Sequence, residues 1–180
     1  QIRYSATMDL GFNVKNLVLL QVPDARRLKI TNVLKNEIMS RAQIPAAAIT
    51  FLPSAQNRGL SVFRLENSPQ AKGFQAQTLS FDPDFITTFG LKVVAGRNFA
   101  PGRTSENEGV LINERAARDF GFADPVGQVI YRNDKPQQII GVVRDWHTNS
   151  IHSLIEPVVM TLSGETAGNL VVRIPAENRA

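Results

Sequence analysis

Residues 137 to 159 read QQIIGVVRDWHTNSIHSLIEPVV, and they place the chain's only tryptophan and both of its histidines between two apolar runs. The runs IIGVV and PVV are short, rich in β-branched residues and flanked by polar residues, which predicts two buried strands. The polar residues between the runs therefore form a connection that is either a chemical site or a structural corner.

Asp145, His147 and His152 in this connection are residue types that serve as metal ligands or as general acids and bases. A zincin helix carries two histidines four residues apart with a glutamate between them. Here the histidines are five residues apart and no carboxylate lies between them. No G-x-S-x-G nucleophile motif occurs anywhere in the chain. We therefore predict no catalytic residue and no metal site, and interpret the histidines as structural or surface residues.

Trp146 follows a predicted strand and is the aromatic side chain that we expect to be most exposed. Trp146 and His147 are therefore the candidate residues for contact with a partner. For Trp146 we favour a second interpretation, in which the ring packs as an anchor of the loop.

The composition is typical of a folded globular domain, with 43% hydrophobic and 20% charged residues over 180 positions. The absence of cysteine excludes disulfides, zinc–thiolate centres and thiol catalysis. The net charge of +4 comes from scattered lysines and arginines without a basic stripe, so we expect no nucleic-acid partner. Neither glycine-rich phosphate-binding motif is present, and no cofactor is predicted.

No apolar run approaches the 18 or more residues that a membrane span needs, and the first residues lack the pattern of a signal peptide. The opening QIRYSATMDLGFNVKN is unlike an initiator sequence, and the closing AENRA resembles the first turn of a helix. We therefore expect this chain to be a domain excised from a larger protein.

The first fifty residues predict a β-α-β unit. NLVLLQV at 16–22 and AAITFL at 47–52 are apolar runs typical of strands, and residues 25–42 have helical periodicity. The apolar positions of that helix are Ile30, Val33, Leu34 and Ile38. We expect the two strands to form a parallel pair with a right-handed crossover.

Two short helices in the middle of the chain are marked by their caps. In DPDFITTFG, Asp82 is predicted at the N-cap, Pro83 at the first helical position and Gly90 just past the end. In NERAARDFG, Asn113 is predicted at the N-cap and Gly121 at the end. The buried side of the first helix is predicted to carry Phe85, Ile86 and Phe89.

Short strands make up most of the remaining chain. The predicted strands cover residues 60–66, 74–81, 91–99, 109–112, 124–131, 137–143, 156–162 and 169–174. The two strands on either side of RNDKP are expected to pair as a hairpin. The sequence therefore predicts a mixed α+β fold.

Several stretches, taken in order, resemble the extracytoplasmic domain of MacB-like and FtsX-like ABC transporter permeases. They are DLGFNVKNLVLLQV, FDPDFITTFGLKVVAGRNF, GVLINERAARDFGFADPVGQVI and QQIIGVVRDWHTNSIHSLIEPVVM. The hallmarks of that family are a GR.F turn, an INE.AA..FG...P.G stretch and an IIGVV.D.H..S......P stretch, which correspond here to residues 96–99, 112–127 and 139–157. The resemblance spans residues 9–174, and Trp146 stands where the family more often has phenylalanine.

The resemblance implies two subdomains. One is a membrane-proximal β-α-β unit, residues 1–52 with 163–180, shortened on its C-terminal side, and the other is an inserted β-rich unit, residues 53–162. The expected location is the periplasmic side of the bacterial cytoplasmic membrane. The expected partners are an ABC ATPase subunit, reached through the membrane part of the permease, a second permease copy or domain, and a periplasmic adaptor or an exported peptide or lipoprotein.

The function implied by the resemblance is mechanical. ATP-driven movement of the membrane helices would be carried outward by this domain, which is itself not an enzyme, to export or release a substrate at the outer face. Hinges are expected around residues 53–54 and at 163–168. An alternative is an extracytoplasmic binding or sensing module for a peptide, antibiotic or lipoprotein, which a concave apolar patch would favour. A third reading, a stand-alone hydrolase, would require a cleft where Asp, His and Ser side chains converge.

Overall fold

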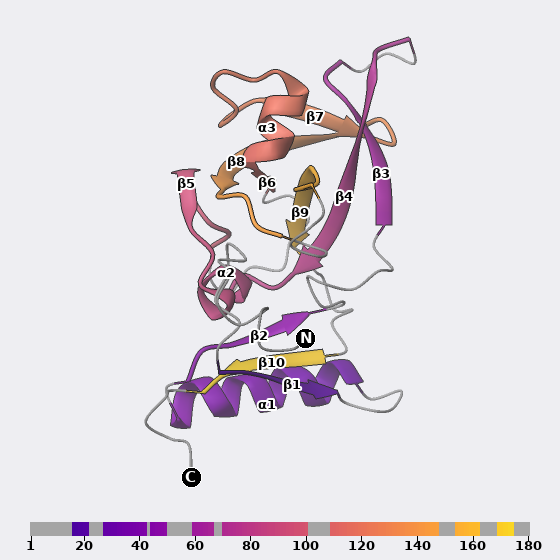
Figure 1. Cartoon of the computed structure of the whole chain (residues 1–180). Helices are drawn as coiled ribbons and strands as arrows, with labels where there is room; N and C mark the ends of the chain where they lie inside the picture. The colour runs from indigo at the N-terminus through magenta and orange to yellow at the C-terminus, as the bar shows by residue number, and fades with distance from the viewer. Residues whose placement is uncertain are drawn as a thin grey trace.

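The computed structural model describes residues 16–21, 27–42, 44–49, 59–66, 70–100, 109–147, 154–162 and 169–174 (Figure 1). Within them the helices are α1 (Arg27–Arg41), α2 (Phe85–Phe89) and α3 (Glu114–Phe120). The strands are β1 (Leu17–Gln21), β2 (Ala46–Ile49), β3 (Gly59–Arg64), β4 (Gly73–Phe81), β5 (Val93–Gly96), β6 (Val110–Asn113), β7 (Val129–Arg132), β8 (Lys135–Val143), β9 (Val158–Leu162) and β10 (Asn169–Arg173). The predicted mixed α+β class is confirmed. None of these described helices is long and apolar enough to cross a bilayer.

One end of the molecule is a small sheet of β1, β10 and β2 with α1 along one face (Figure 1). We call this unit the α1 layer. β10 pairs antiparallel with both β1 and β2, so β1 and β2 run parallel but are not neighbours. The prediction that they pair directly is therefore wrong. Residues 170–172 of β10 are buried, whereas β1 is partly exposed, so β10 suits the central position.

Helix α1 buries one side against this sheet. Leu34 and Ile38 pack there with residues of β2 and β10, as the predicted stripe requires. Val33 is 57% exposed, so its place in the stripe is wrong. The buried side instead includes Thr31, because residues 31, 34 and 38 share one helical face and residue 33 lies off it. The side chain of Ile30 lies outside the described residues.

The other end of the molecule is a closed ring of strands. β4, β3, β7, β8, β6 and β9 pair in that order, and β9 also pairs with β4. β5 is added to β8 outside the ring. The hairpin predicted around RNDKP is confirmed, with Asn133 and Asp134 at φ 50° and 62°, as a two-residue hairpin turn of type I′ requires.

Strand β6 is buried on both faces, whereas β3 exposes Leu60 and Val62 on one face. Successive side chains of a strand point to opposite faces, so Val110 and Ile112 of β6 join one core while Leu111 between them joins the other. The inner core receives side chains from every ring strand and from α3. The outer core lies between the ring, α2, β5 and the α1 layer.

The outer core joins the two ends of the molecule. It contains Ala47 and Val171 from the α1 layer together with Leu79 and Met160 from the ring. By contrast, the backbone ladder between β2 and β4 consists of one residue pair, Ile49↔Phe81. The subdomain boundaries at 52/53 and 162/163 stay predictions, and the predicted hinges at 53–54 and 163–168 lie outside the described residues.

The short helices end at the glycines that the sequence predicts. Gly90 and Gly121 both adopt the left-handed conformation, at φ 65° and 77°. The predicted N-cap Asp82 is wrong by two residues, because Asp84 occupies that position. Asp82 Oδ1 instead accepts a hydrogen bond of 3.1 Å from the Asp84 N–H, so it stabilises the turn that leads into α2. The predicted buried residues of α2 are confirmed: Phe85, Ile86 and Phe89.

Candidate functional site: a polar junction at helix α3

The corner between β6 and α3 is organised by Asn113, which is fully buried. Its Oδ1 accepts hydrogen bonds from the backbone N–H groups of Ala116 at 3.0 Å and Val158 at 2.9 Å. Its Nδ2 donates to the carbonyl of Glu156 at 2.9 Å. The bond to Ala116 is the predicted N-cap and is confirmed. The other two bonds attach the segment that leads into β9 to the same corner.

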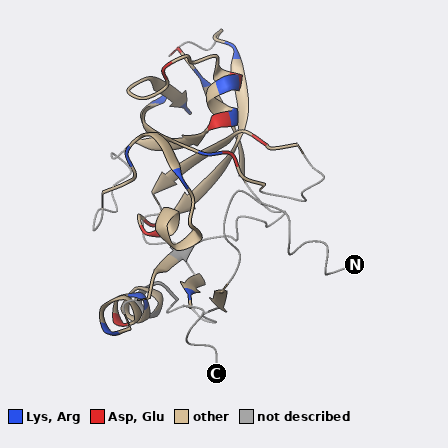
Figure 2. Cartoon of the chain, turned by 60° about the vertical axis from the view of Figure 1, so that its left-hand side comes forward, with Lys and Arg blue, Asp and Glu red and all other residues tan. Residues whose placement is uncertain are grey.

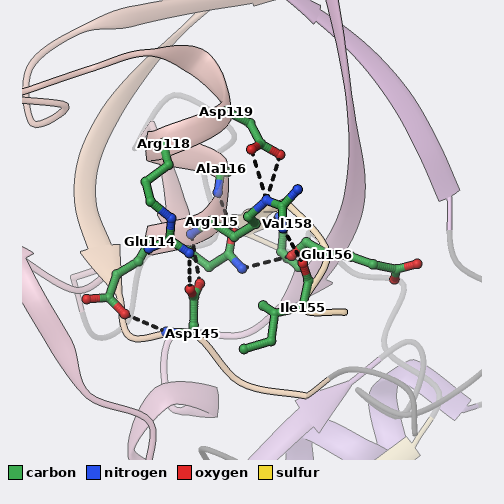
Figure 3. Close-up of polar contacts among 10 residues, drawn as sticks. Glu114, Arg115, Ala116, Arg118, Asp119, Asp145, Ile155, Glu156 and Val158 are labelled. Carbon is green, nitrogen blue, oxygen red and sulfur yellow. Dashed lines mark hydrogen bonds and ion pairs between the residues drawn. The ribbon is translucent and has the colours of Figure 1, made fainter. Parts of the chain in front are cut away.

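Asp145, just after β8, reaches the start of α3 from another direction (Figure 3). Its Oδ1 accepts from the backbone N–H of Arg115 at 2.7 Å, and its Oδ2 accepts from the Arg118 guanidinium at 2.6 Å. In return, the Asp145 N–H donates to the Glu114 carboxylate at 2.9 Å. Carboxylates are stabilised here because the first N–H groups of a helix lack partners within the helix.

The ion pair with Asp145 affects the protonation of Arg118. The hydrogen bond to Asp145 raises the pKa of the Arg118 guanidinium above its ordinary value, against a smaller lowering by desolvation. Arg118 therefore remains charged at any physiological pH. The side chain of Arg118 is 60% exposed, so solvent screens the ion pair. Arg118 therefore contributes less to the stability of the fold than Asp145, whose side chain is 13% exposed.

Arg115 completes the network on the first turn of α3 (Figure 3). Its Nε lies 2.9 Å from both carboxylate oxygens of Asp119, four residues on, and its Nη1 donates to the carbonyl of Ile155 at 3.4 Å. The network thus connects the β6–α3 corner, the loop after β8 and the segment before β9. We call it the α3 junction; its side chains are Asn113, Glu114, Arg115, Arg118, Asp119 and Asp145.

The chemistry of the α3 junction is that of a structural connection. Its carboxylates face guanidinium groups or backbone N–H groups, and such charge-assisted hydrogen bonds are stronger than neutral ones. In the part of the chain that the structure describes, no group of three His, Asp or Glu side chains could hold a metal ion. The arrangement stiffens the ring by tying together segments that are far apart in the sequence.

The two predicted contact residues lie beside this junction. Trp146 is 1% exposed and belongs to the outer core, so the expectation of an exposed tryptophan is wrong and the interpretation as a packed loop anchor is confirmed. A buried tryptophan ring contributes more to the stability of the fold than an exposed one, because its large apolar surface is removed from water. Its Nε1–H has no hydrogen-bond partner among the described residues. His147 is partly buried, and its contact role stays a prediction. His152 lies outside the described residues.

A second contact joins two of the signature stretches. Gly96 of the GR.F turn lies opposite Gly141 of the IIGVV run in the β5–β8 pair. A Cβ atom on Gly96 would lie 2.3 Å from the carbonyl oxygen of Ile140, and one on Gly141 would lie 2.4 Å from that of Arg97. Gly96 also has φ 69°, which favours glycine. A side chain on either glycine would therefore push apart the two strands that carry these motifs.

Charged side chains are dispersed over the described surface. Figure 2 shows basic and acidic segments interleaved from α1 to α3.

Sequence reasoning found only part of the α3 junction. The i,i+4 spacing of Arg115 and Asp119 is a local signal for an ion pair on a helix. The contacts of Asp145 with Arg115 and Arg118 bridge 30 and 27 residues, and no local pattern indicates them.

Comparison with known proteins gives a consistent result. The family described as MacB-like periplasmic core domain matches residues 7–177. The fold is similar to the periplasmic region of MacB from Actinobacillus actinomycetemcomitans, with a TM-score of 0.61 and 16% identity, over 97% of this chain and 81% of that one. It is also similar to the extracellular domain of the noncanonic ABC-type transporter YknZ from Gram-positive bacteria, with a TM-score of 0.58 and 16% identity, over 90% of this chain and 86% of that one.

No curated protein matches the sequence closely enough to count as a relative. At the identities found, the solved structures show the fold alone, and the family match carries the assignment. The match extends over nearly the whole chain and includes the stretches that form the α3 junction and the β5–β8 glycine pair. This chain belongs to the family of MacB-like periplasmic core domains.

Proposed function

We propose that this domain is part of an ABC transporter permease of the bacterial inner membrane, exposed on the periplasmic side. Its role is to transmit ATP-driven motion of the membrane helices outward, so that a substrate is exported or released at the outer face. The family membership and the fold likeness to periplasmic and extracellular transporter regions support this proposal.

The observation that carries the proposal is the outer core. Ala47 and Val171 of the α1 layer are buried in the same cluster as Leu79 and Met160 of the ring. Close-packed interiors have low compressibility and transmit strain. A displacement applied to the α1 layer would therefore move the ring with it.

Stiffness of the ring supports the same role. Closure through β4–β9 leaves each ring strand paired on both sides over part of its length. The α3 junction ties the end of β8 and the start of β9 to α3. A ring braced in this way transmits displacement with little internal deformation.

The domain itself acts without chemistry in this proposal. ATP hydrolysis belongs to a separate domain or subunit, reached through the membrane part of the permease. A second copy of the permease is one partner, and the two copies move relative to each other. The other partner, an adaptor or an exported peptide or lipoprotein, contacts the outer end of the domain.

The test uses the full permease in lipid nanodiscs together with its ATPase. This chain has no cysteine, so in a permease whose cysteines outside this domain have been replaced, a single Lys135→Cys substitution at the exposed start of β8 takes one spin label per copy. Double electron–electron resonance between the two copies is recorded without nucleotide and with ATP bound but not hydrolysed. We expect the distance to shift between the two states. An unchanged distance in a preparation that hydrolyses ATP would overturn the proposal.

No observation favours the ligand-binding alternative. The exposed large apolar side chains of the described residues are Val18, Val33, Leu60, Val62, Val94 and Leu154. Only Leu60 and Val62 share a strand, so among the described residues no single helix or strand carries more than two of them.

A further inference from the structure

Helix α2 lies between the α1 layer and the ring (Figure 1). It packs against β2 and β10 of the layer, and its phenylalanines belong to the outer core. It therefore touches both parts that the proposed function requires to move together.

The contact of α2 with the ring is largely aromatic. The Phe81 ring at the end of β4 stacks on Phe85, with centroids 3.5 Å apart and planes at 4°, and Phe85 lies 4.3 Å from Phe89. All three side chains are at most 2% exposed. On the same side, Asn98 Nδ2 donates to the Pro83 carbonyl at 3.1 Å, which attaches the turn before α2 to the segment after β5. These contacts attach α2 and the turn before it to the ring.

The contact of α2 with the α1 layer is ionic at one end. Lys35 of α1 places its Nζ 2.6 Å from Asp82 Oδ2 and 2.5 Å from Asp84 Oδ2, just before α2 begins. The side chains of Lys35 and Asp82 are only 11% and 12% exposed. Ion pairs sheltered to this degree are screened far less by salt than surface pairs.

The other end of α2 is held by the central strand of the same layer. Arg173 of β10 donates from Nε to the carbonyl of Thr88 at 2.7 Å. This carbonyl belongs to the last turn of α2, where a cation is favoured by the free carbonyl groups. Both ends of α2 are thus bound by cations of the α1 layer, one from α1 and one from β10.

These polar contacts differ in kind from the outer core. The hydrophobic effect that holds the outer core together is non-directional, so it sets the angle between the layer and the ring less tightly than hydrogen bonds of defined geometry do. The β2–β4 ladder, with one residue pair, adds little directional restraint. Ion pairs at one end of a short helix and a charge-assisted hydrogen bond to a backbone carbonyl at the other end together define an orientation.

We propose that a set of four residues fixes the orientation of the ring relative to the α1 layer. We call this set the α2 clamp; its members are Lys35, Asp82, Asp84 and Arg173. Through the clamp, α2 passes movement of the layer on to the ring. This inference rests on the proposed function for its purpose, although the clamp itself can be tested without it. Lys35 is a positioning residue in this mechanism.

The experiment measures orientation within one chain of the full permease. Spin labels at Ser40→Cys on α1 and Lys135→Cys on the ring report one distance across the clamp, and both positions are exposed. The doubly labelled permease, without further substitutions, is diluted with unlabelled permease so that only distances within one chain are measured. It is expected to give one narrow distance distribution, which is the same with and without nucleotide. Lys35→Met is expected to broaden it in both states and to reduce the ATP-driven shift between copies.

A second variant covers the case in which Lys35→Met unfolds because two carboxylates lose their counter-ion. The neutral variant Lys35→Met/Asp82→Asn/Asp84→Asn removes all three charges together, and such replacements of buried ion pairs are often neutral for stability. It is expected to keep its melting temperature and still broaden the distribution. Arg115→Met is the matched control, because the Arg115–Asp119 ion pair lies on α3, outside the labelled hairpin, and its loss should leave the distribution narrow.

The outcomes separate the two proposals. A narrow, unshifted distribution within the chain of the neutral variant overturns the clamp, whatever happens between copies. A broadened distribution in that variant, with no ATP-driven shift between wild-type copies, supports the clamp and overturns the proposed function.

Discussion

Gly96 and Gly141 face each other across the β5–β8 pair, and the backbones approach so closely that neither residue has room for a Cβ atom. The pair lies where the turn after β5 meets the middle of β8. Two sequence motifs whose glycines lie 45 residues apart, at positions 96 and 141, thus meet in one backbone contact.

Gly96→Ala should therefore destabilise the domain more than an alanine at a glycine with free space. The strain of a left-handed residue costs about 1–2 kcal/mol and overpacking about 1–3 kcal/mol, so we expect a loss of about 3 kcal/mol. Gly121 is the matched control, because it has φ 77° but no atom within 4 Å of an added Cβ. Urea unfolding followed by circular dichroism gives both values, and equal losses would contradict the close-contact explanation.

Asn113→Ala should remove three hydrogen bonds at once. Loss of an N-cap costs about 0.5–2 kcal/mol, and leaving buried groups of Glu156 and Val158 unpaired costs about 1–3 kcal/mol, so we expect a total near 3 kcal/mol. Asn113→Ser keeps a capping oxygen and should lose less. Chemical unfolding of the two variants tests this ranking, which would be refuted if serine were as harmful as alanine.

Substituting Asp145 should cost more stability than substituting its ion-pair partner Arg118. Arg118→Gln removes an exposed cation and should cost under about 1 kcal/mol. Asp145→Ala also leaves the Arg115 N–H without its acceptor and should cost about 2 kcal/mol. Asp145→Asn, which keeps an acceptor oxygen, should fall between them. Melting curves of the three variants measure the order, and a larger loss for Arg118→Gln would count against this account of the junction.

The contribution of Lys35 to stability should depend on pH. Burial, the largest single effect, lowers the pKa of Lys35, but the neighbouring Asp82 and Asp84 raise it more, so the folded-state pKa lies above the ordinary 10.5. The stabilisation is therefore complete below pH 10.5 and is lost as the pH rises through the folded-state value. Lys35→Met should cost about 2 kcal/mol near neutral pH.

The same comparison at higher pH checks the sign. The difference in unfolding free energy between wild type and Lys35→Met should be constant from neutral pH to about pH 9 and should shrink above about pH 11. Denaturant titrations at fixed ionic strength provide the measurement. Arg41→Met serves as control, since its partner Glu37 and Arg41 itself are 51% and 81% exposed. A difference that grows with pH would contradict the assignment of Lys35 as a charged partner.

Trp146 should report burial directly, because it is the only tryptophan of the chain. We expect emission of the native chain to be blue-shifted and resistant to acrylamide, and both properties to change on unfolding. His147→Ala should leave the emission unchanged if the ring is held by the outer core rather than by its neighbour. Efficient quenching in the native state would show that the ring is exposed.

Local features were well predicted from the sequence. Asn113 and Gly121 end α3 as expected, because capping depends on residues within one turn of each other. The β7–β8 hairpin followed from turn residues between two apolar runs. The shift of the α2 N-cap from Asp82 to Asp84 is the scale of error that local rules allow at a helix end.

Features that depend on distant partners were not predicted. The sequence favours a packed loop anchor for Trp146, but it does not indicate the outer core of β4, α2 and β9 in which the ring is buried. The two acidic partners of Lys35 lie 47 and 49 residues away, and no local pattern indicates them. Neither burial nor ion pairing at such separation leaves a periodic signal in the sequence.

The sequence by itself determined the apolar runs that become strands, the caps that end the short helices, and the ordered motifs that indicate the family. Tertiary structure alone decided that β10 lies between β1 and β2, that β4 and β9 close the ring, and that α2 is bound at both ends by the α1 layer. The physical reason is that propensity and capping act between near neighbours in the chain. The choice of strand partner depends instead on which arrangement buries the most apolar surface while pairing every backbone group.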